Sequence, residues 1–183
     1  MKNHLARSAK YDKIYLRTDN LKGNTVGSRS NNLAYIAGFL DGDGSLMAQI
    51  KRRKDGRLKR RFMLTIFFYQ DSRNEKPLFW IRDILGIGYI SRRNDKMTEL
   101  RINGFAQIRR IINDLIPFLK FKKEQAIALH KSSDILAKSK SSKLTKKDLL
   151  KLVDYILIIQ NKNYITKRKK NRKELLKILD LTP

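Results

Sequence analysis

Cysteine is absent from the 183 residues of this chain, and histidine occurs only as His4 and His130. The sequence therefore offers no disulfide bond, thiolate zinc site or cysteine nucleophile. Two isolated histidines do not suggest a histidine-centred active site, because each is more simply a surface or packed residue. No apolar run approaches the ~20 residues that a membrane span needs, and the N-terminus lacks the apolar core of a secretory signal. We expect a soluble, intracellular protein with no membrane partner.

Acidic residues are scarce, with 17 Asp and Glu against 42 Lys and Arg, so the formal net charge is +25. A chain this basic repels itself unless a polyanion neutralises it, which predicts a nucleic-acid partner. Charge gives affinity rather than chemistry, so a ribosomal, histone-like or other architectural binder stays open beside an enzyme. The abundance of Lys, Ile and Asn suits an AT-rich coding genome, which leaves a chloroplast or mitochondrial location open.

One folded domain is the simplest organisation for a chain of this length. Residues 1–32 are polar and basic with no sustained apolar period, which predicts a basic N-terminal extension outside the core. Residues 33–183 then form a single domain whose tail, from about residue 122, is helical. The Lys- and Ser-rich segment 138–148 has the composition of an exposed connection.

The hydropathy pattern predicts an α+β fold whose first helix covers residues 33–40 and stops at the Asp- and Gly-rich segment 41–45. Two hairpins with alternating polarity follow, one turning at Asp55–Gly56 and the other at Asn94–Asp95. Both hairpins are expected in one antiparallel sheet. The predicted strands cover residues 45–53, 60–69, 88–93 and 97–103.

Between the hairpins, Ser72–Glu75 fits a capping box that starts a helix running to about Leu85, with Pro77 in its first turn. After the second hairpin the period of the apolar residues becomes helical again. These later helices are expected over residues 105–115, 122–137, 145–160 and 166–179.

Small residues recur every four positions along the first helix, at Ala34, Gly38 and Gly42. One side of this helix is therefore almost without side chains, and the backbone of a partner helix can approach it closely. If that partner is the same helix of a second copy, a two-fold axis brings the two Asp43 carboxylates together. Two adjacent carboxylates need divalent cations between them, and Mg²⁺ suits oxygen ligands. The plainer alternative is a core helix that ends in a polar Gly-rich turn.

Residues 36–44 read IAGFLDGDG and resemble the LAGLIDADG motif of a homing endonuclease family. The motif occurs once, and single-motif members of that family are homodimers. The similarity continues in the order αββαββα from about Leu33 to Pro117, including Gly86–Tyr89, and on through residues 117–122. It implies an endonuclease that makes double-strand breaks in a long, near-palindromic DNA target, of about 20 bp, and leaves short 3′ overhangs.

The resemblance also implies roles for individual residues. Asp43 is expected to bind the metals, with the Gly42 carbonyl as a further ligand. Gln70 matches a strand-end glutamine that helps order water, and Lys122 matches a lysine that offsets charge in the transition state. Mg²⁺ is the expected cofactor, and Mn²⁺ or Ca²⁺ are further candidates for the site. The predicted dimer interface comprises Ala34, Gly38, Asp41 and Gly42, with the Asp41 side chain expected to cap or hydrogen-bond near the helix end.

Sequence specificity is expected from the strands, whose polar side chains would lie in the major groove of double-stranded DNA. The candidates for contacts to base edges are Gln49, Lys51, Arg53 and Arg61. The candidates for phosphate contacts are Arg57, Lys59, Arg92, Arg93 and Arg101. Each of these residues alone is equally well explained as a solvated surface charge, so the prediction concerns the face as a whole.

Three observations compete with or depart from this interpretation. The same scaffold also serves in intron maturases, so intron RNA is an alternative partner, although the intact Asp43 favours cleavage. Relatives of this kind often carry a basic residue where this chain has Asn74, with Arg73 beside it. The set of side chains that orders water near Gln70 is therefore expected to differ in part. A calcium-binding loop beginning at Asp41 is excluded, because Leu46 and Arg52 occupy its glycine and glutamate positions.

Overall fold

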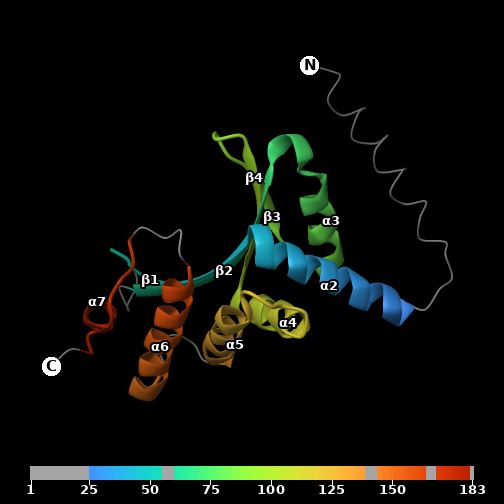
Figure 1. The fold of residues 1–183 in the computed structure, drawn as a ribbon. Helices are drawn as coiled ribbons and strands as arrows, with labels where there is room; N and C mark the ends of the chain where they lie inside the picture. Colours follow the sequence, from blue (N-terminus) through green and yellow to red (C-terminus); the bar gives the residue numbers. More distant parts are fainter. Residues whose placement is uncertain (1–24, 55–59, 139–143, 164–167, 182–183) are drawn as a thin grey trace. The chain divides into compact units, whose positions relative to one another are not determined.

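The structure is a computed structural model that describes residues 25–54, 60–138, 144–163 and 168–181. It divides into two compact units, Met1–Asn32 and Leu33–Pro183, and the second contains the sheet and the site. The elements are α2 (Thr25–Asp43), β1 (Gly44–Arg52), β2 (Arg60–Asp71), a 3₁₀ turn η1 (Ser72–Asn74), α3 (Lys76–Leu85), β3 (Tyr89–Arg92), β4 (Met97–Asn103), α4 (Phe105–Leu115), α5 (Lys123–Lys138), α6 (Lys146–Lys162) and α7 (Arg172–Ile178). This order confirms the predicted αββαββα arrangement with helices after it (Figure 1).

The four described strands form one antiparallel sheet in the order β1-β2-β4-β3. The two hairpins therefore join through β2 and β4, as predicted, with Phe67 opposite Arg101. In the first hairpin Gly44 pairs with Phe68, so β2 extends beyond the point where α2 passes into β1. This register places the end of β2 beside the end of α2.

The alternating polarity of the strands separates the two faces of the sheet. Leu46, Ala48 and Ile50 are buried, whereas Met47 and Gln49 between them are only half-buried. Because successive side chains point to opposite faces, one face of the sheet packs against helices. The other face carries the polar side chains predicted for it.

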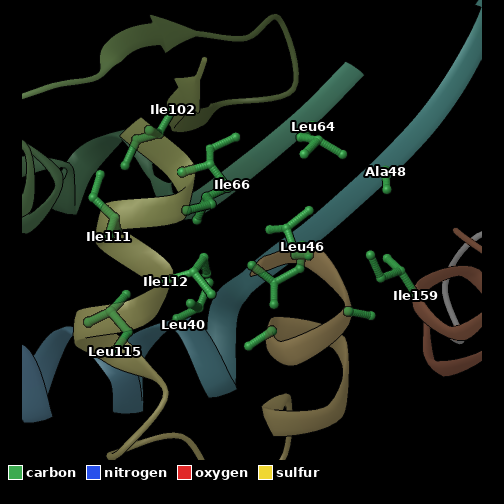
Figure 2. Close-up of a cluster of buried hydrophobic side chains, with 14 of the residues drawn as sticks. Leu40, Leu46, Ala48, Leu64, Ile66, Ile102, Ile111, Ile112, Leu115 and Ile159 are labelled. Atoms are coloured by element: carbon green, nitrogen blue, oxygen red, sulfur yellow. The ribbon is translucent and has the colours of Figure 1, made fainter. Parts of the chain in front are cut away.

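The core lies between the apolar face of the sheet and the helices α2 to α7. Figure 2 shows part of this cluster, in which Leu40 of α2, Leu46 of β1 and Ile112 of α4 belong to one group of buried side chains. Burying such side chains is the main source of stability, and truncating a buried leucine to alanine typically costs about 2–5 kcal/mol. The core therefore anchors the C-terminal half of α2 from one side.

Helix α2 is longer than the sequence predicted, because it begins at Thr25 and continues through Asp43. Its N-terminal residues lack an apolar period, and a helix backbone needs none to satisfy its hydrogen bonds. At the other end, a glycine inside a helix costs only about 1 kcal/mol. Burial of Leu40 and Asp41 holds the last turn, so Gly42 does not end the helix.

The predicted capping box at Ser72–Glu75 is wrong. Glu75 makes no side-chain capping hydrogen bond to α3, and Asp71 instead caps the short η1 turn through Arg73 N–H. The Glu75 carboxylate instead accepts hydrogen bonds from Thr98 and Arg92, and the bond from Arg92 joins two opposite charges. Pro77 lies in the first turn of α3 as expected, and the helix ends at Gly86 with φ 70°.

The C-terminal helices follow the prediction with shifted ends. Helix α6 begins after Thr145, whose side chain and Asp148 form a reciprocal capping box. Helix α7 starts at Arg172 rather than at residue 166, because Asn171 and Glu174 form a second capping box there. Residues 139–143 of the predicted connection lie outside the described residues, as does the predicted turn at Asp55–Gly56. No described helix combines the length and apolar character needed to cross a membrane.

Candidate active site

The last turn of α2 presents an exposed carboxylate. Asp43 is the final residue of the helix, and its side chain makes no hydrogen bond or ion pair with another described residue. Gly42 before it is exposed as well. The free carbonyl groups at a helix C-terminus carry partial negative charge and attract cations. This end of α2 therefore combines carboxylate and carbonyl oxygens, the ligand types that Mg²⁺ and Ca²⁺ prefer.

Asp41 is buried and its side chain bonds within the chain. Its carboxylate accepts the backbone N–H groups of Lys120, Phe121 and Lys122 at 2.6, 3.1 and 2.9 Å. The predicted hydrogen bonding of Asp41 near the helix end is thus present in the structure. Both carboxylate oxygens therefore accept intrachain N–H groups, and the place of Asp41 in a dimer interface stays a prediction.

Lys122 lies beside the two aspartates although it is about 80 residues away in sequence. Its ammonium group donates a hydrogen bond to the carbonyl oxygen of Asp41, and its own carbonyl accepts the first backbone bond of α5, from Ala126. Burial lowers the pKa of Lys122, while the charges of Asp41 and Asp43 oppose that shift. The Lys122 ammonium therefore lies at the end of α2, where the charge of Asp43 also acts on it.

Gln70 occupies the end of β2, two residues beyond the partner of Gly44. It lies on the same face of the strand as the buried Phe68, which is the face that packs against helices. Its side-chain oxygen accepts the Asp71 backbone N–H at 2.9 Å, which orients the amide and leaves its NH₂ donors available. The register thus brings Gln70 to the end of the sheet where Asp43 and Lys122 lie.

The described part of one chain contains no cluster of three or more His, Asp or Glu residues that could hold a metal. Asp43 provides a single carboxylate at this place.

The open face of the first hairpin carries like charges opposite each other. Lys51 pairs with Arg61 across β1 and β2, and both side chains are exposed. Like charges directly opposite in a sheet are destabilising, which a bound polyanion would relieve. Gln49 lies on the same face and Arg53 follows the end of β1, whereas Arg57 and Lys59 lie outside the described residues.

On the second hairpin, Arg101 lies on the same open face and is held by two neighbours. Its guanidinium donates to the buried Glu99 and lies 5.2 Å from the centre of the Phe67 ring. Arg93 pairs with Asp95 at 2.8 Å and lies 3.9 Å from Glu99. These arginines are therefore pre-oriented by carboxylates, which the sequence did not predict.

Arg92 does not fit the predicted DNA-binding face. It alternates with Ser91 and shares a face with Ile90, so its side chain leaves the sheet on the side of α3. There its guanidinium Nε lies 2.9 Å from the Glu75 carboxylate. Strand alternation thus directs Arg92 away from the open face, and its contact with phosphate stays a prediction.

Two exposed aromatic residues lie on α2 or next to its end, and the sequence prediction missed them. Tyr35 is 57% exposed and contacts Trp80 of α3 edge-to-face at 5.4 Å between ring centres. Phe121 is 86% exposed and directly precedes Lys122. For Phe121 the sequence does contain a signal, because an aromatic residue lies between Lys120 and Lys122 and an exposed charged loop does not require one.

Known proteins with this combination of motif and fold were found by comparison. A model of the LAGLIDADG endonuclease family matches residues 36–125. The chain is 33% identical over 110 residues to the DNA endonuclease I-CreI of Chlamydomonas reinhardtii, an alignment covering 60% of this chain and 67% of that enzyme. The chain belongs to the LAGLIDADG endonuclease family. This LAGLIDADG chain is also 36% identical over 93 residues, 51% of its length, to the DNA endonuclease I-CvuI of Chlorella vulgaris, and the match spans 58% of that relative.

Solved structures of LAGLIDADG relatives share the fold. I-CvuI in complex with its target in the presence of 2 mM Ca superimposes with a TM-score of 0.67 and 28% identity, covering 85% of this chain and 99% of that one. I-CvuI with the I-CreI target and 2 mM Mg, in which the DNA is not cleaved, has a TM-score of 0.66 and the same identity, over 84% and 97%. The archaeal intron-encoded homing endonuclease I-Vdi141I, complexed with DNA, reaches 0.71 at 24% identity, over 82% and 95%, and supports the fold alone.

Proposed function

We propose that this chain is a site-specific DNA endonuclease that depends on divalent metal ions and cuts both strands of a long, near-palindromic target as a homodimer. The observation that carries this proposal is the exposed Asp43 at the end of α2, with Lys122 and Gln70 beside it and an open basic sheet face leading away from it. The relatives with known activity are DNA endonucleases, which favours cleavage of DNA over the maturase alternative.

The homodimer is supported by the unoccupied side of α2. A Cβ atom added at Gly38 or Gly42 would meet no atom within 4 Å, and Ala34 on the same stripe is exposed. Tyr35 of α2 and Phe121, whose N–H bonds to Asp41 at the end of this helix, supply exposed apolar surface. Isologous contact along it would place the two copies of Asp43 side by side on the two-fold axis.

Asp43 and the Gly42 carbonyl from each copy would hold divalent cations, which activate water and polarise the scissile phosphate. Mg²⁺ is the expected ion, and Mn²⁺ and Ca²⁺ are candidates to replace it. Lys122 brings a positive charge to the position where the phosphate becomes more negative, which lowers the barrier most in a site that excludes water. Gln70 donates its NH₂ hydrogens to solvent at the same place, where they would orient the attacking water.

The open face of the sheet would recognise the target. Lys51 and Arg61 carry hydrogen-bond donors on long side chains, and in the described part of the chain neither makes an ion pair with a carboxylate. Such donors are suited to acceptors on guanine in the major groove. A two-fold dimer doubles this surface, which predicts a target with matching half-sites.

Selection of cut sites from randomised DNA duplexes tests the proposal without knowledge of the target. The purified chain is incubated with the library in Mg²⁺ or in EDTA, and the ends formed are sequenced. We expect Mg²⁺-dependent double-strand breaks with short 3′ overhangs at one family of near-palindromic sequences. Absence of metal-dependent cuts, together with preferential binding of structured RNA, would support the maturase alternative instead.

A further inference from the structure

The connection between α4 and α5 is built around the Asp41 carboxylate. Three consecutive N–H groups, from Lys120, Phe121 and Lys122, point at this one side chain. Successive N–H groups that converge in this way form a concavity suited to an anion, and a carboxylate oxygen accepts such bonds strongly. The side chains of Lys120 and Phe121 are exposed, so it is their backbone N–H groups that the carboxylate holds.

The same residue also receives the end of the lysine side chain. The Lys122 ammonium donates to the Asp41 carbonyl, so Asp41 contacts both the backbone and the terminal nitrogen of Lys122. A lysine side chain has many rotamers, and fixing it at both ends removes most of them. The ammonium is thereby kept at the last turn of α2, which ends in Asp43.

We propose that Asp41 is a positioning residue of the cleavage site, acting through Lys122 and touching neither the metal ions nor the DNA. This inference rests on the proposed function, since it assigns Asp41 a part in cleavage. It differs from a purely structural role, in which Asp41 would only tie α2 to the connection before α5. The two roles differ in whether the effect of Asp41 depends on the Lys122 side chain.

A double-mutant cycle separates these roles. Asp41→Asn is made in the wild-type chain and in Lys122→Met, and single-turnover cleavage of the selected target is measured with Mg²⁺. We expect Asp41→Asn alone to slow cleavage by about 10- to 100-fold, as losses of residues that orient a catalytic group do. In the Lys122→Met background the same change should slow cleavage by less than about threefold, because no ammonium remains to be positioned.

Target affinity with Ca²⁺ and the sedimentation of the dimer should stay unchanged in Asp41→Asn. Asp148→Asn is a matched control, since Asp148 also accepts a backbone N–H but caps α6 away from the site, and it should cleave at the wild-type rate. Equal slowing by Asp41→Asn in both backgrounds, or loss of the dimer, would overturn the proposal.

Amide hydrogen exchange of the unaltered chain covers the case in which Asp41→Asn does not fold. The proposal requires slow exchange at Lys120, Phe121 and Lys122 despite the exposure of this segment. Rapid exchange of these amides overturns it. Amide exchange does not depend on cleavage. A wild-type chain that cuts no DNA would therefore refute the proposed function, and the exchange rates would still report whether Asp41 holds the three N–H groups.

Discussion

Two aspartates separated by a single glycine have opposite surroundings at the end of α2. Asp41 is buried and accepts hydrogen bonds from a distant segment, whereas Asp43 is exposed and has no described partner. The helical rotation of about 100° per residue turns the two side chains to opposite sides. Asp41 therefore stabilises the fold, whereas the Asp43 carboxylate is accessible to a metal ion.

Asp43→Asn is expected to abolish cleavage and to leave binding of the target within about threefold, because an amide is a poor ligand for a hard cation while the sheet face is unchanged. Cleavage of the selected target in Mg²⁺ and binding with Ca²⁺ measure the two effects. A variant that cuts at nearly the wild-type rate would contradict the assignment of Asp43 as metal ligand.

Glu75→Gln is expected to flatten the acid dependence of stability. Hydrogen bonds from Arg92 lower the pKa of the Glu75 carboxyl below its ordinary value of 4.5, so ionised Glu75 stabilises the folded chain. That contribution is complete above the ordinary value and is lost as the pH falls below it. Urea unfolding at about pH 6 and about pH 3 should show a larger fall for wild type than for the variant. Identical pH dependence in both proteins would show that the pair contributes nothing.

At the scale of elements, α2 combines a buried side with an open one. Ile36, Ala37 and Leu40 are fully buried, and Ala34, Gly38 and Gly42 form the exposed stripe. The buried side anchors the helix in its own core, so the small residues are not needed for packing within one chain. A partner surface is the physical reason for keeping them small.

Gly38→Leu is expected to convert the dimer to monomer without unfolding the chain. The added side chain meets no atom within one copy, and leucine favours a helix over glycine by roughly 0.5–1 kcal/mol. Sedimentation should report the monomer, and thermal unfolding of the monomer should be unimpaired. Ala106→Leu on the exposed side of α4 is the control and should remain dimeric. An unchanged dimer of Gly38→Leu would place the interface elsewhere.

The sheet provides a second prediction at this scale, because its two faces assign different partners to two arginines. Arg61→Ala is expected to weaken binding of the preferred target by about 1–3 kcal/mol and to relax selection at one or two base pairs. Arg92→Ala should change target affinity by less than about 0.5 kcal/mol, since Arg92 pairs with Glu75 on the other side. Base-by-base competition binding measures both. Equal losses would mean that both arginines contact DNA backbone.

At the scale of the whole molecule, the net charge of +25 per chain sets the response to salt. Affinity for any DNA should fall by about 10³-fold or more between 50 and 200 mM salt, because bound phosphates release their counterions. The ratio between target and unrelated duplex should persist, since base contacts do not depend on counterions. A ratio near one at every salt concentration would support the architectural binder and contradict the endonuclease.

Much of the fold was predictable because it depends on neighbours in sequence. The alternation along β1, the helical period of α4 and the small-residue stripe of α2 are local patterns, and each was confirmed, whereas β4 buries Thr98, Glu99 and Leu100 in succession. The errors concern charged groups: the supposed capping box at Ser72–Glu75 and the direction of Arg92. Both depend on the neighbouring strands, because Thr98 of β4 and Arg92 of β3 hold the Glu75 carboxylate.

The sequence by itself therefore determined the family motif, the order of elements and the polar and apolar sides of each, because side-chain periodicity is a property of consecutive residues. Only the tertiary structure decided the partner of each charge. Asp41 meets the segment before α5, and Glu75 meets Arg92. Each carboxylate could pair with many basic residues in so basic a chain. Helix packing and strand register decide which of them lies close enough to do so.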